Sequence, residues 1–502
     1  MTTGFPANAV PAHAGAALPR KVFAAVDIGA SSGRVMLGRV SPTSGVALET
    51  IHRFPNGVVE LDGGLRWAFD ALFAEVLKGL TAAAAVAASN GERIVSLGID
   101  TWAVDYGLVD SSGQLVSAPF SYRDERSRAT VERVHAVIPP EKLYAVTGLQ
   151  FLQFNTLYQL AAEPSLAGLQ ALMIPDLIAF LLTGERRTEA TNASTTGLFD
   201  AVSGSWAFDF LDALGLPRDI FPPLIQPGDP VGVVLPAIAE RTGLPADTTV
   251  VAVGSHDTAS AVAAVPALQE DFAYISSGTW SLVGVELDHP VLTEASRKAN
   301  FTNERGVDGT IRYLRNVGGL WLLSECQRSW AAQGFSQSLP ALLDAAAALP
   351  PGGPQINVDD PAFTAPDNMP ERIRAAVRHN GEVLPDRPDA VVRCIMDSLA
   401  AGYARTLADA ERLTGRSTSV VHVVGGGSQN RLLCQLTAEA TGKPVVAGPV
   451  EATALGNVLV QARAAGVVSG GLAELRALVS AGTELVRYEP ALAERLVRHS
   501  AG

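Results

Sequence analysis

A polar segment near the middle of the chain, Gly254-Ser255-His256-Asp257-Thr258, carries side chains that could transfer a proton. It follows an apolar run at residues 249–253 and precedes a run of small apolar residues at 261–265. This pattern predicts a buried strand, a tight turn and a helix, which would hold the Asp257 carboxylate rigidly at a sheet edge. A carboxylate held in this way suits a general base. Aspartate is also a common helix cap, so the segment alone leaves both roles open.

Two hairpins tipped with serine and glycine are predicted far apart in the chain. Strands at 22–26 and 35–40 flank Asp27-Ile28-Gly29-Ala30-Ser31-Ser32-Gly33-Arg34, and strands at 272–275 and 280–287 flank Ser276-Ser277-Gly278-Thr279. Backbone N–H groups and hydroxyls at such tips can bind phosphate, while Asp27 could hold a water of Mg²⁺ and Arg34 could reach the phosphates. Either hairpin taken singly also fits an ordinary polar turn. Their repetition suggests a duplicated fold with a nucleotide clamped between two halves.

Further polar clusters stand between apolar segments and could line a pocket for a polyhydroxylated ligand. They are Asp100-Thr101-Trp102-Ala103-Val104-Asp105-Tyr106 after a strand at 94–99, Tyr122-Arg123-Asp124, Gln153-Phe154-Asn155-Thr156, and Asn192-Ala193-Ser194-Thr195-Thr196. The alternative is that Trp102 belongs to the core, that Asp105 lies at the surface, and that the Asn, Ser and Thr residues make turns and caps.

Three consecutive glycines, Gly425-Gly426-Gly427, follow an apolar strand at 420–424 and precede a helix at 432–440. Glycines at the start of a helix let an adenine ring or a phosphate approach the backbone closely. A simple strand-to-helix turn explains the same residues, so this motif also stays open.

The elements that must position these residues alternate between strand and helix, which predicts an α/β protein. The length of 502 residues exceeds what one hydrophobic core usually holds and suggests two or three domains. Apolar residues at fourfold spacing predict a helix from Asp70, with Leu72, Val76 and Leu80, and a helix that ends at Gly415, with Ile395, Leu399, Tyr403 and Leu407. Further helices are expected at 172–183 and from Asn316-Val317-Gly318-Gly319-Leu320-Trp321.

Charge and composition exclude several classes of partner. The net charge of −13 argues against nucleic acid and anionic membranes, since both would be repelled at long range. Cys326, Cys394 and Cys434 lack metal-ligand spacing and are expected to be reduced core residues of a cytoplasmic protein. No stretch is expected to combine the length and lack of charge needed to span a bilayer.

Common nucleotide-binding motifs are absent from the sequence. There is no GxxxxGK[ST] loop, no GxGxxG that opens a Rossmann unit, and no HRD and DFG pair, so P-loop enzymes and protein kinases are set aside. What remains is a two-lobed fold with paired phosphate hairpins and a strand-end aspartate between them.

With these features the chain resembles the FGGY carbohydrate kinases of the actin, hexokinase and Hsp70 superfamily, from about residue 22 to residue 460. The resemblance rests on the blocks at 25–35, 98–105, 122–124, 151–160, 191–196, 255–262, 276–282, 316–323, 425–430 and 448–456. The blocks Gln153-Phe154-Asn155-Thr156-Leu157-Tyr158-Gln159-Leu160 and Gly448-Pro449-Val450-Glu451-Ala452-Thr453 are similar to the branch that acts on L-rhamnulose.

The resemblance implies a duplicated ribonuclease H-like fold with the active site in a cleft between domains. The expected divisions are an extension at 1–20, an N-terminal domain at 21–265, a C-terminal domain at 266–490 and a tail at 491–502. The implied activity is ATP-dependent phosphorylation of the 1-hydroxyl of L-rhamnulose, with Mg²⁺, by a monomer or homodimer. A sister kinase for fuculose or xylulose, and a non-catalytic ATP switch or sugar sensor, are the alternatives.

The resemblance also assigns roles to residues. Asp257 is implied as the proton acceptor, and Ala103, His256, Asp257 and Thr258 as sugar-binding residues. The implied ATP-binding residues are Ala30, Ser31, Ser32, Gly33, Arg34, Thr279, Asn316, Ser324 and one or more of Gly425, Gly426 and Gly427. Two positions depart from the family pattern, since Ala103 often has Gly as its counterpart and Ser324 has Gln.

Overall fold

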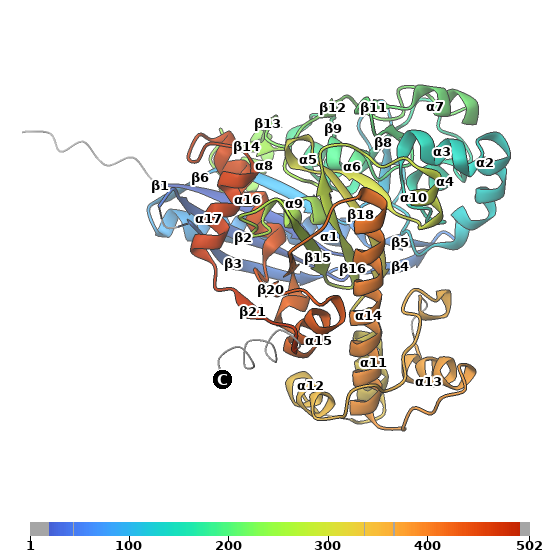
Figure 1. Cartoon of the computed structure of the whole chain (residues 1–502). Helices are drawn as coiled ribbons and strands as arrows, with labels where there is room; N and C mark the ends of the chain where they lie inside the picture. Colours follow the sequence, from blue (N-terminus) through green and yellow to red (C-terminus); the bar gives the residue numbers. More distant parts are fainter. Residues whose placement is uncertain (1–19, 44, 336, 365–366, 492–502) are drawn as a thin grey trace, which may run out of the picture.

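The computed structural model describes residues 20–43, 45–335, 337–364 and 367–491. The extension and tail predicted at 1–20 and 491–502 lie outside these ranges except for Arg20 and Ala491. The chain forms two lobes, each built on one large sheet (Figure 1).

The N-terminal lobe contains a six-stranded sheet in the order β13-β14-β6-β1-β2-β3. Its strands are β13 (Pro230–Val233), β14 (Thr249–Val251), β6 (Glu92–Thr101), β1 (Arg20–Ile28), β2 (Ser32–Ser41) and β3 (Gly45–Pro55). Strands β1 to β3 form an antiparallel meander, whereas β6 runs parallel to β1, and β14 runs parallel to β6. The carboxyl ends of β1, β6 and β14 therefore meet at one edge of the sheet.

The C-terminal lobe contains a seven-stranded sheet in the order β17-β18-β16-β15-β19-β20-β21. Its strands are β17 (Thr302–Arg305), β18 (Ile311–Gly318), β16 (Trp280–Leu287), β15 (Phe272–Ser277), β19 (Val420–Val424), β20 (Val445–Ala447) and β21 (Val486–Tyr488). Here too an antiparallel meander, β15-β16-β18, is followed by two strands parallel to its first strand and to each other, β19 and β20. The two sheets repeat one topology, which confirms the duplication predicted from the hairpins.

Helices cover the outer faces of both sheets. In the N-terminal lobe these are α1 (Phe69–Ser89) and α5 (Ile174–Thr183); in the C-terminal lobe they are α14 (Pro388–Thr414) and α15 (Arg431–Thr441). Helices α11 (Trp321–Ala332), α12 (Leu339–Ala347) and α13 (Met369–His379) pack on α14. The spacing predictions for two of them are confirmed, since Leu72, Val76 and Leu80 are buried in α1 and Gly415 ends α14 in a left-handed conformation with φ of 69°.

The smaller elements extend the N-terminal lobe or connect the larger ones. They are β4 (Val58–Leu61), β5 (Gly64–Trp67), β7 (Tyr106–Val109), η1 (Glu125–Thr130), α2 (Val131–Val137), α3 (Pro140–Thr147), α4 (Thr156–Ala161), β8 (Gln170–Met173), β9 (Thr188–Glu189), α6 (Ala190–Ala193), β10 (Phe199–Asp200), β11 (Ser205–Trp206), α7 (Phe208–Leu214), β12 (Leu224–Ile225), α8 (Pro236–Thr242), α10 (Glu294–Lys298), η2 (Val307–Gly309), η3 (Pro361–Phe363) and η4 (Gly426–Gln429).

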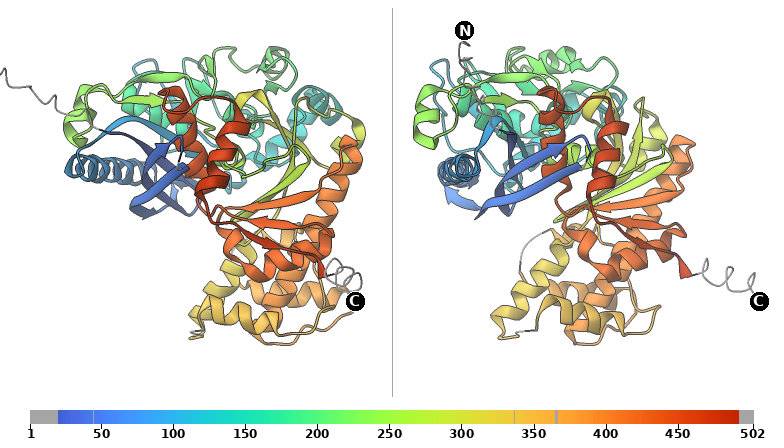
Figure 2. Two further views of the ribbon diagram at one scale, coloured as in Figure 1. Left: turned by 60° about the vertical axis from the view of Figure 1, so that its left-hand side comes forward. Right: turned by 90° about the vertical axis from the view of Figure 1, so that its left-hand side faces the viewer.

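Three helices lie between the two sheets: α9 (Asp257–Ala263), α16 (Ala452–Ala464) and α17 (Leu472–Gly482). Helix α16 follows the last parallel strand of the C-terminal sheet, yet it packs on β1 and β6 of the N-terminal sheet and along α9. Figure 2 shows this red helix against the blue strands. Residues of both sheets share one apolar cluster around these helices, including Phe23, Met36, Tyr274 and Leu282. The lobes are therefore joined by a common core.

Three local predictions need correction. Asn316 does not open a helix but pairs with Leu282 inside the sheet, and helix α11 begins only at Trp321. The helix expected at 172–183 begins at Ile174, because Leu172 pairs with Gly107 in a small hairpin. Helix α1 is, by length and composition, long and apolar enough to cross a membrane, contrary to expectation. Its apolar face packs in the N-terminal core, as in the core helix of a soluble protein.

Candidate active site

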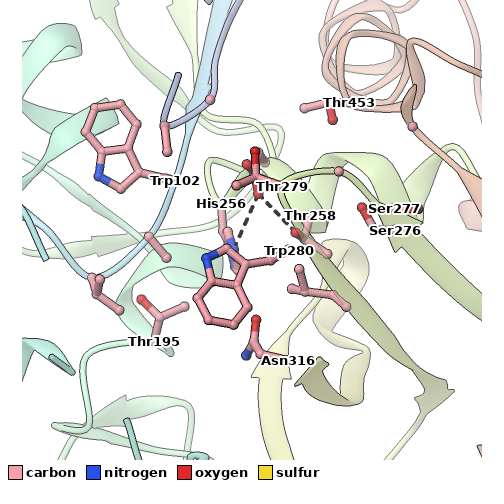
Figure 3. Close-up of a pocket in the computed structure, with 18 of the residues that line it drawn as sticks. Trp102, Thr195, His256, Thr258, Ser276, Ser277, Thr279, Trp280, Asn316 and Thr453 are labelled. Atoms are coloured by element: carbon pink, nitrogen blue, oxygen red, sulfur yellow. Dashed lines mark hydrogen bonds and ion pairs between the residues drawn. The ribbon is translucent and has the colours of Figure 1, made fainter. Parts of the chain in front are cut away.

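A cavity of about 360 Å³ lies between the lobes, where the two hairpin tips and the polar segment around Asp257 come together. Figure 3 shows this cavity, with residues from both lobes pointing into it. The residues predicted from the sequence that line it are Asp27, Ala30, Ser31, Ser32, Arg34, Ala103, His256, Asp257, Thr258, Thr279, Asn316, Gly425 and Gly426. Residues from six distant parts of the chain thus line one space.

Three predicted nucleotide-binding residues do not line the cavity. A Cβ at Gly33 would strike the ring of Phe54, and one at Gly427 would strike the Ser277 hydroxyl, so both glycines permit close packing behind the tips. Ser324 lies on the exposed side of α11, one turn beyond the start of the helix. The predicted contacts of these three residues with ATP therefore have no support from their placement.

Asp257 is the first residue of α9, and it is not the cap of that helix, which is His256. Its side chain is about one-third exposed to the cavity. The Thr258 hydroxyl donates to Asp257 Oδ1 at 3.0 Å, and His256 Nε2 lies 3.4 Å from the same oxygen. These two interactions are the dashed lines that end on Thr258 and His256 in Figure 3. The carboxylate is therefore oriented by its neighbours and open to a ligand.

The turn before Asp257 is held by a buried carboxylate that the sequence did not reveal. The backbone N–H and hydroxyl of Ser255 donate to Glu189 Oε2 at 3.0 and 2.7 Å. The N–H of Thr191 donates to the other oxygen of Glu189 at 2.8 Å. Burial raises the pKa of Glu189, although these donors oppose the rise. A Cβ at Gly254 would meet the backbone of α9 at 2.7 Å, so glycine is required for this turn.

Arg34 connects the first hairpin to the opposite lobe. Its Nε and Nη2 donate to Asp27 Oδ2 at 3.0 and 2.7 Å, and Nη2 lies 3.0 Å from Glu451 Oε2. Arg53 donates to the other oxygen of Glu451 at 3.0 Å. Glu451 immediately precedes α16 and lines the cavity. The guanidinium thus lies at the cavity wall between carboxylates of the two lobes.

Negative charge is concentrated where β1 and β6 end. Asp27 and Asp100 are neighbours on these parallel strands and are 5 % and 0 % exposed. Burial raises the pKa of Asp27, with Asp257 and Glu451 contributing and Arg34 opposing, and burial together with Asp27 raises the pKa of Asp100 well above its usual range. A cluster of carboxylates that is this costly to ionise favours a nearby cation.

The wall opposite the hairpins is aromatic and apolar. Trp102, Ala103, Val104, Tyr122 and Phe154 contribute to it. Val104 has φ of 69°, which is a strained conformation for a β-branched residue, and its carbonyl accepts a hydrogen bond from the Thr156 hydroxyl at 2.7 Å. Strain of this kind is typical of residues held in place beside a ligand.

Asp105 holds this wall together from behind, contrary to its possible surface position. It is fully buried and accepts hydrogen bonds from the indoles of Trp67 and Trp102, the backbone of Tyr122 and the amide of Gln159. Burial raises the pKa of Asp105 to about 6 although the four donors oppose the rise. Trp102 is a core residue and a wall residue at once, since it is 6 % exposed and lines the cavity.

Only some residues of the remaining polar clusters belong to the cavity wall. Tyr122, Phe154, Asn155 and Thr195 line the cavity, whereas Asp124 caps η1. Residues that line the cavity without being singled out as candidates include Gln150, Trp280, Thr302, Glu304, Glu451 and Thr453. For Glu304 the available signal was a polar run, Thr302-Asn303-Glu304-Arg305, after Phe301.

Family models match most of the chain. The model of the FGGY family of carbohydrate kinases, N-terminal domain, matches residues 22–264, and the model of the C-terminal domain of the same family matches residues 273–465.

Several curated proteins named rhamnulokinase are similar to this chain over most of their length. The protein of Bacteroides thetaiotaomicron is 42 % identical over 474 residues, which cover 93 % of this chain and 96 % of the relative. Those of Klebsiella pneumoniae strain 342 and Bacillus subtilis are 44 % and 38 % identical, covering 87 % and 88 % of this chain and 88 % and 90 % of the relatives.

Solved structures of several kinases share the fold. The gluconate kinase from Lactobacillus acidophilus superposes with a TM-score of 0.76 at 15 % identity, covering 96 % of both chains. The xylulose kinase from Rhodospirillum rubrum gives 0.74 at 20 % identity, covering 94 % of this chain and 96 % of the other. The Plasmodium falciparum glycerol kinase with ADP gives a TM-score of 0.75 at 13 % identity, covering 96 % of this chain and 97 % of the other. The two-lobed α/β fold expected from the sequence is confirmed by these likenesses.

Proposed function

The chain belongs to the FGGY family of carbohydrate kinases, and from this premise we propose that it transfers the γ-phosphoryl group of ATP to the 1-hydroxyl of L-rhamnulose. The products are L-rhamnulose 1-phosphate and ADP, a step in the breakdown of L-rhamnose. The observation that carries the proposal is the identity of about 40 % with rhamnulokinases over nearly the whole chain.

The proposed base is Asp257. An alcohol must lose its proton as its oxygen bonds to phosphorus, and one positioned carboxylate can accept that proton. Thr258 and His256 both approach Asp257 Oδ1, which leaves Oδ2 for the ketose hydroxyl. The aromatic wall around Trp102 and Tyr122 is placed to contact the C–H groups of the sugar, while His256 and Thr258 provide polar contacts.

The proposed nucleotide site consists of the two hairpin tips together with Gly425 and Gly426. The Gly29 N–H is engaged by Ser32 O at 2.9 Å, so the first tip is a tight turn whose hydroxyls remain at the cavity. Asn316 lines the same cavity from β18. Phosphoryl transfer has little covalent chemistry for the protein, so positioning and charge neutralisation dominate.

We infer that Asp27 contributes to Mg²⁺ binding. Among the described residues no group of three or more His, Cys, Asp or Glu side chains could hold a metal ion. Mg²⁺ is commonly held by one or two carboxylates, water and substrate phosphates, and both hydrogen bonds of Arg34 go to Oδ2 of Asp27, so Oδ1 fits this role. When bound, the ion would neutralise phosphate charge. Arg34 can contribute to the same end from the cavity wall.

The experiment that tests the function is ATP consumption by the purified protein with L-rhamnulose, L-fuculose and L-xylulose, with mass analysis of the products. We expect kcat/KM to be highest for L-rhamnulose and the product to carry phosphate at C1. A higher value for another ketose would identify a sister kinase. ATP hydrolysis that no ketose changes would point to an ATP switch or sugar sensor.

The cellular location, partner and oligomeric state of the enzyme are also proposals. A cytoplasmic location is supported by the three cysteines, which are all free and buried. A small ketose as the partner follows from the family, and a monomer or homodimer stays a prediction that size-exclusion chromatography with light scattering can test.

A further inference from the structure

Glu304 and Arg312, two buried charged residues of the C-terminal lobe, meet His256 of the N-terminal lobe beside the cavity. Glu304 Oε2 lies 3.1 Å from His256 Nδ1 and 3.0 Å from Arg312 Nη2, and Arg312 Nη2 lies 3.1 Å from the same ring nitrogen. Arg312 is 0 % and Glu304 4 % exposed. Arg312 is fixed further by its Nε, which donates to the Arg305 carbonyl at 3.0 Å. The imidazole of His256 is therefore a contact between the two lobes.

The charges in this cluster decide which atom of the imidazole carries a proton. Burial alone would raise the pKa of Glu304, but the positive charge of Arg312 and the contact with His256 bring it below its usual value. An ionised carboxylate can only accept hydrogen bonds. Glu304 therefore balances the guanidinium of Arg312, whose Nη2 donates to Nδ1 of His256, and we assign the ring proton to Nε2.

The orientation of the ring follows from this assignment. With Nδ1 turned to Glu304, Nε2 is turned to the cavity and lies 3.4 Å from Asp257 Oδ1. Figure 3 shows His256 with its dashed line on this side. The ion pair of Glu304 and Arg312 thus fixes the tautomer and direction of the His256 ring, and the ring in turn faces Asp257.

We propose that Glu304, with its charge balanced by Arg312, is a positioning residue that holds His256 in the orientation needed by Asp257 and by the ketose. The proposal deepens the proposed function and rests on it for the choice of substrate. Because Glu304 belongs to β17 and His256 to the other lobe, the competent orientation requires both lobes to be in place. Two other roles for Glu304 must be separated from this one: a buried ion pair that only stabilises the fold, and a direct contact with the sugar.

The first test compares two variants with the same charge. Glu304→Gln/Arg312→Met and Glu304→Leu/Arg312→Met both remove the ion pair, but only the first keeps a side chain that can donate a hydrogen bond to Nδ1. Misplacing a group by about 1 Å can cost 10²-fold in rate, so we expect kcat to be at least ~10-fold higher in the Gln variant, with similar KM for ATP. Equal kcat values in the two variants, at equal melting temperatures, would overturn the proposal.

The second test repeats the comparison with His256→Asn added to both variants. If Glu304 acts through His256, the difference between Gln and Leu disappears, because the group that it orients is absent. If the KM for the sugar still differs between the Gln and Leu variants, Glu304 contacts the sugar directly, and the proposal is contradicted. The assay uses whichever ketose the wild type phosphorylates fastest. Failure with L-rhamnulose would therefore count against the proposed function, and a persistent difference would count against the role of Glu304.

A third readout needs no substrate. Long-range ¹H–¹⁵N NMR of the imidazole nitrogens, assigned with His256→Asn, reports whether Nδ1 is protonated. We expect an unprotonated Nδ1 in the wild type and a change of tautomer or charge in Glu304→Leu/Arg312→Met. An unchanged Nδ1 signal would overturn the assignment.

A matched control is the ion pair of Glu286 and Arg476, which is also largely buried, with Oε2 and Nη1 2.8 Å apart, but does not line the cavity. Glu286→Leu/Arg476→Met should leave kcat within about threefold of the wild type. If kcat falls as much as in the Glu304→Leu/Arg312→Met variant, both effects come from the loss of a buried ion pair, and the proposal is overturned.

Discussion

Asp257 has two carboxylate oxygens in different surroundings. Oδ1 receives the Thr258 hydroxyl and faces His256 Nε2, whereas Oδ2 has no hydrogen-bond partner among the described residues. A carboxylate with one engaged and one open oxygen keeps its orientation while it accepts a proton. This asymmetry favours the role of base over that of helix cap.

Replacing Asp257 with Asn should therefore remove turnover but retain binding. Asn keeps the shape of the side chain and can accept from Thr258, but it cannot accept a proton from the ketose hydroxyl. We expect kcat to fall by about 10²- to 10⁴-fold, with dissociation constants for sugar and ATP within a few-fold of the wild type by calorimetry. Retention of more than about a tenth of the wild-type kcat would exclude Asp257 as the base.

Residue types and their place at strand ends were enough to predict most of the candidate site. The polar segment around Asp257 and the first hairpin tip line one cavity, as expected. Gly33 and Gly427 were assigned to the nucleotide by the resemblance to the family, and neither of them lines the cavity. A sequence does not show what lies next to the Cα of a glycine. Here the space that a Cβ would need is filled by Phe54 at Gly33 and by Ser277 at Gly427.

At the level of elements, periodicity predicted the long helices and central strands well, and failed where pairing overrides local preference. Asn316-Val317-Gly318 precedes a helix, but this segment completes a strand beside β16. Strand β17 has only four residues and no clear alternation, so its place at the sheet edge next to His256 depends on contacts distant in sequence. This is why Glu304 was not predicted.

Strand β19 contains a buried histidine that should make stability depend on pH. His422 is 5 % exposed, and burial, with Arg476 and Arg487 nearby, lowers its pKa to about 4. The unfolded chain binds a proton near the ordinary pKa of about 6.5, so this contribution to stability is present above that pH and is lost as pH falls toward 4. The loss amounts to about 3 kcal/mol.

His422→Gln removes this titration, so we expect a smaller fall in melting temperature between pH 7 and pH 4.5 than in the wild type. The control is His379→Gln on α13, an exposed histidine, which should follow the wild type. If the melting temperature of the His422 variant falls as much as that of the wild type over this pH range, the buried imidazole is not the source of the acid sensitivity.

On the scale of the whole molecule, the two lobes are joined by the crossing of α9 and α16. Gly456 lies at this crossing, and a Cβ there would overlap the backbone carbonyl of Ser260 in α9. A backbone atom cannot move aside as a side chain can. The close approach of the helices thus depends on one glycine.

Gly456→Ala should destabilise the protein even though alanine is the better helix former by about 1 kcal/mol. Overpacking at a tight contact costs about 1–3 kcal/mol, so we expect a lower melting temperature by calorimetry. Gly402→Ala in α14 is the matched control, since its Cβ would meet only side-chain atoms, those of Val358, Val317 and Arg405 at 3.3, 3.6 and 3.9 Å. It should melt at or slightly above the wild-type temperature. A Gly456 variant that behaves like this control would contradict the close crossing.

The duplication itself was predictable, because the strand and tip pattern recurs in the sequence. The position of α16 was not, since an apolar helix of small residues fits either sheet. Only its contacts with β1, β2 and β6 show which sheet it covers.

The place of α16 has a consequence for biosynthesis. The ribosome releases the strands of the N-terminal sheet early, but the helix that covers one of their faces is translated only after strand β20 of the other lobe. The nascent chain must therefore keep an apolar surface exposed until α16 has been synthesised, which invites chaperone binding. A gene split between the two lobes should yield soluble protein only when both fragments are produced in the same cell.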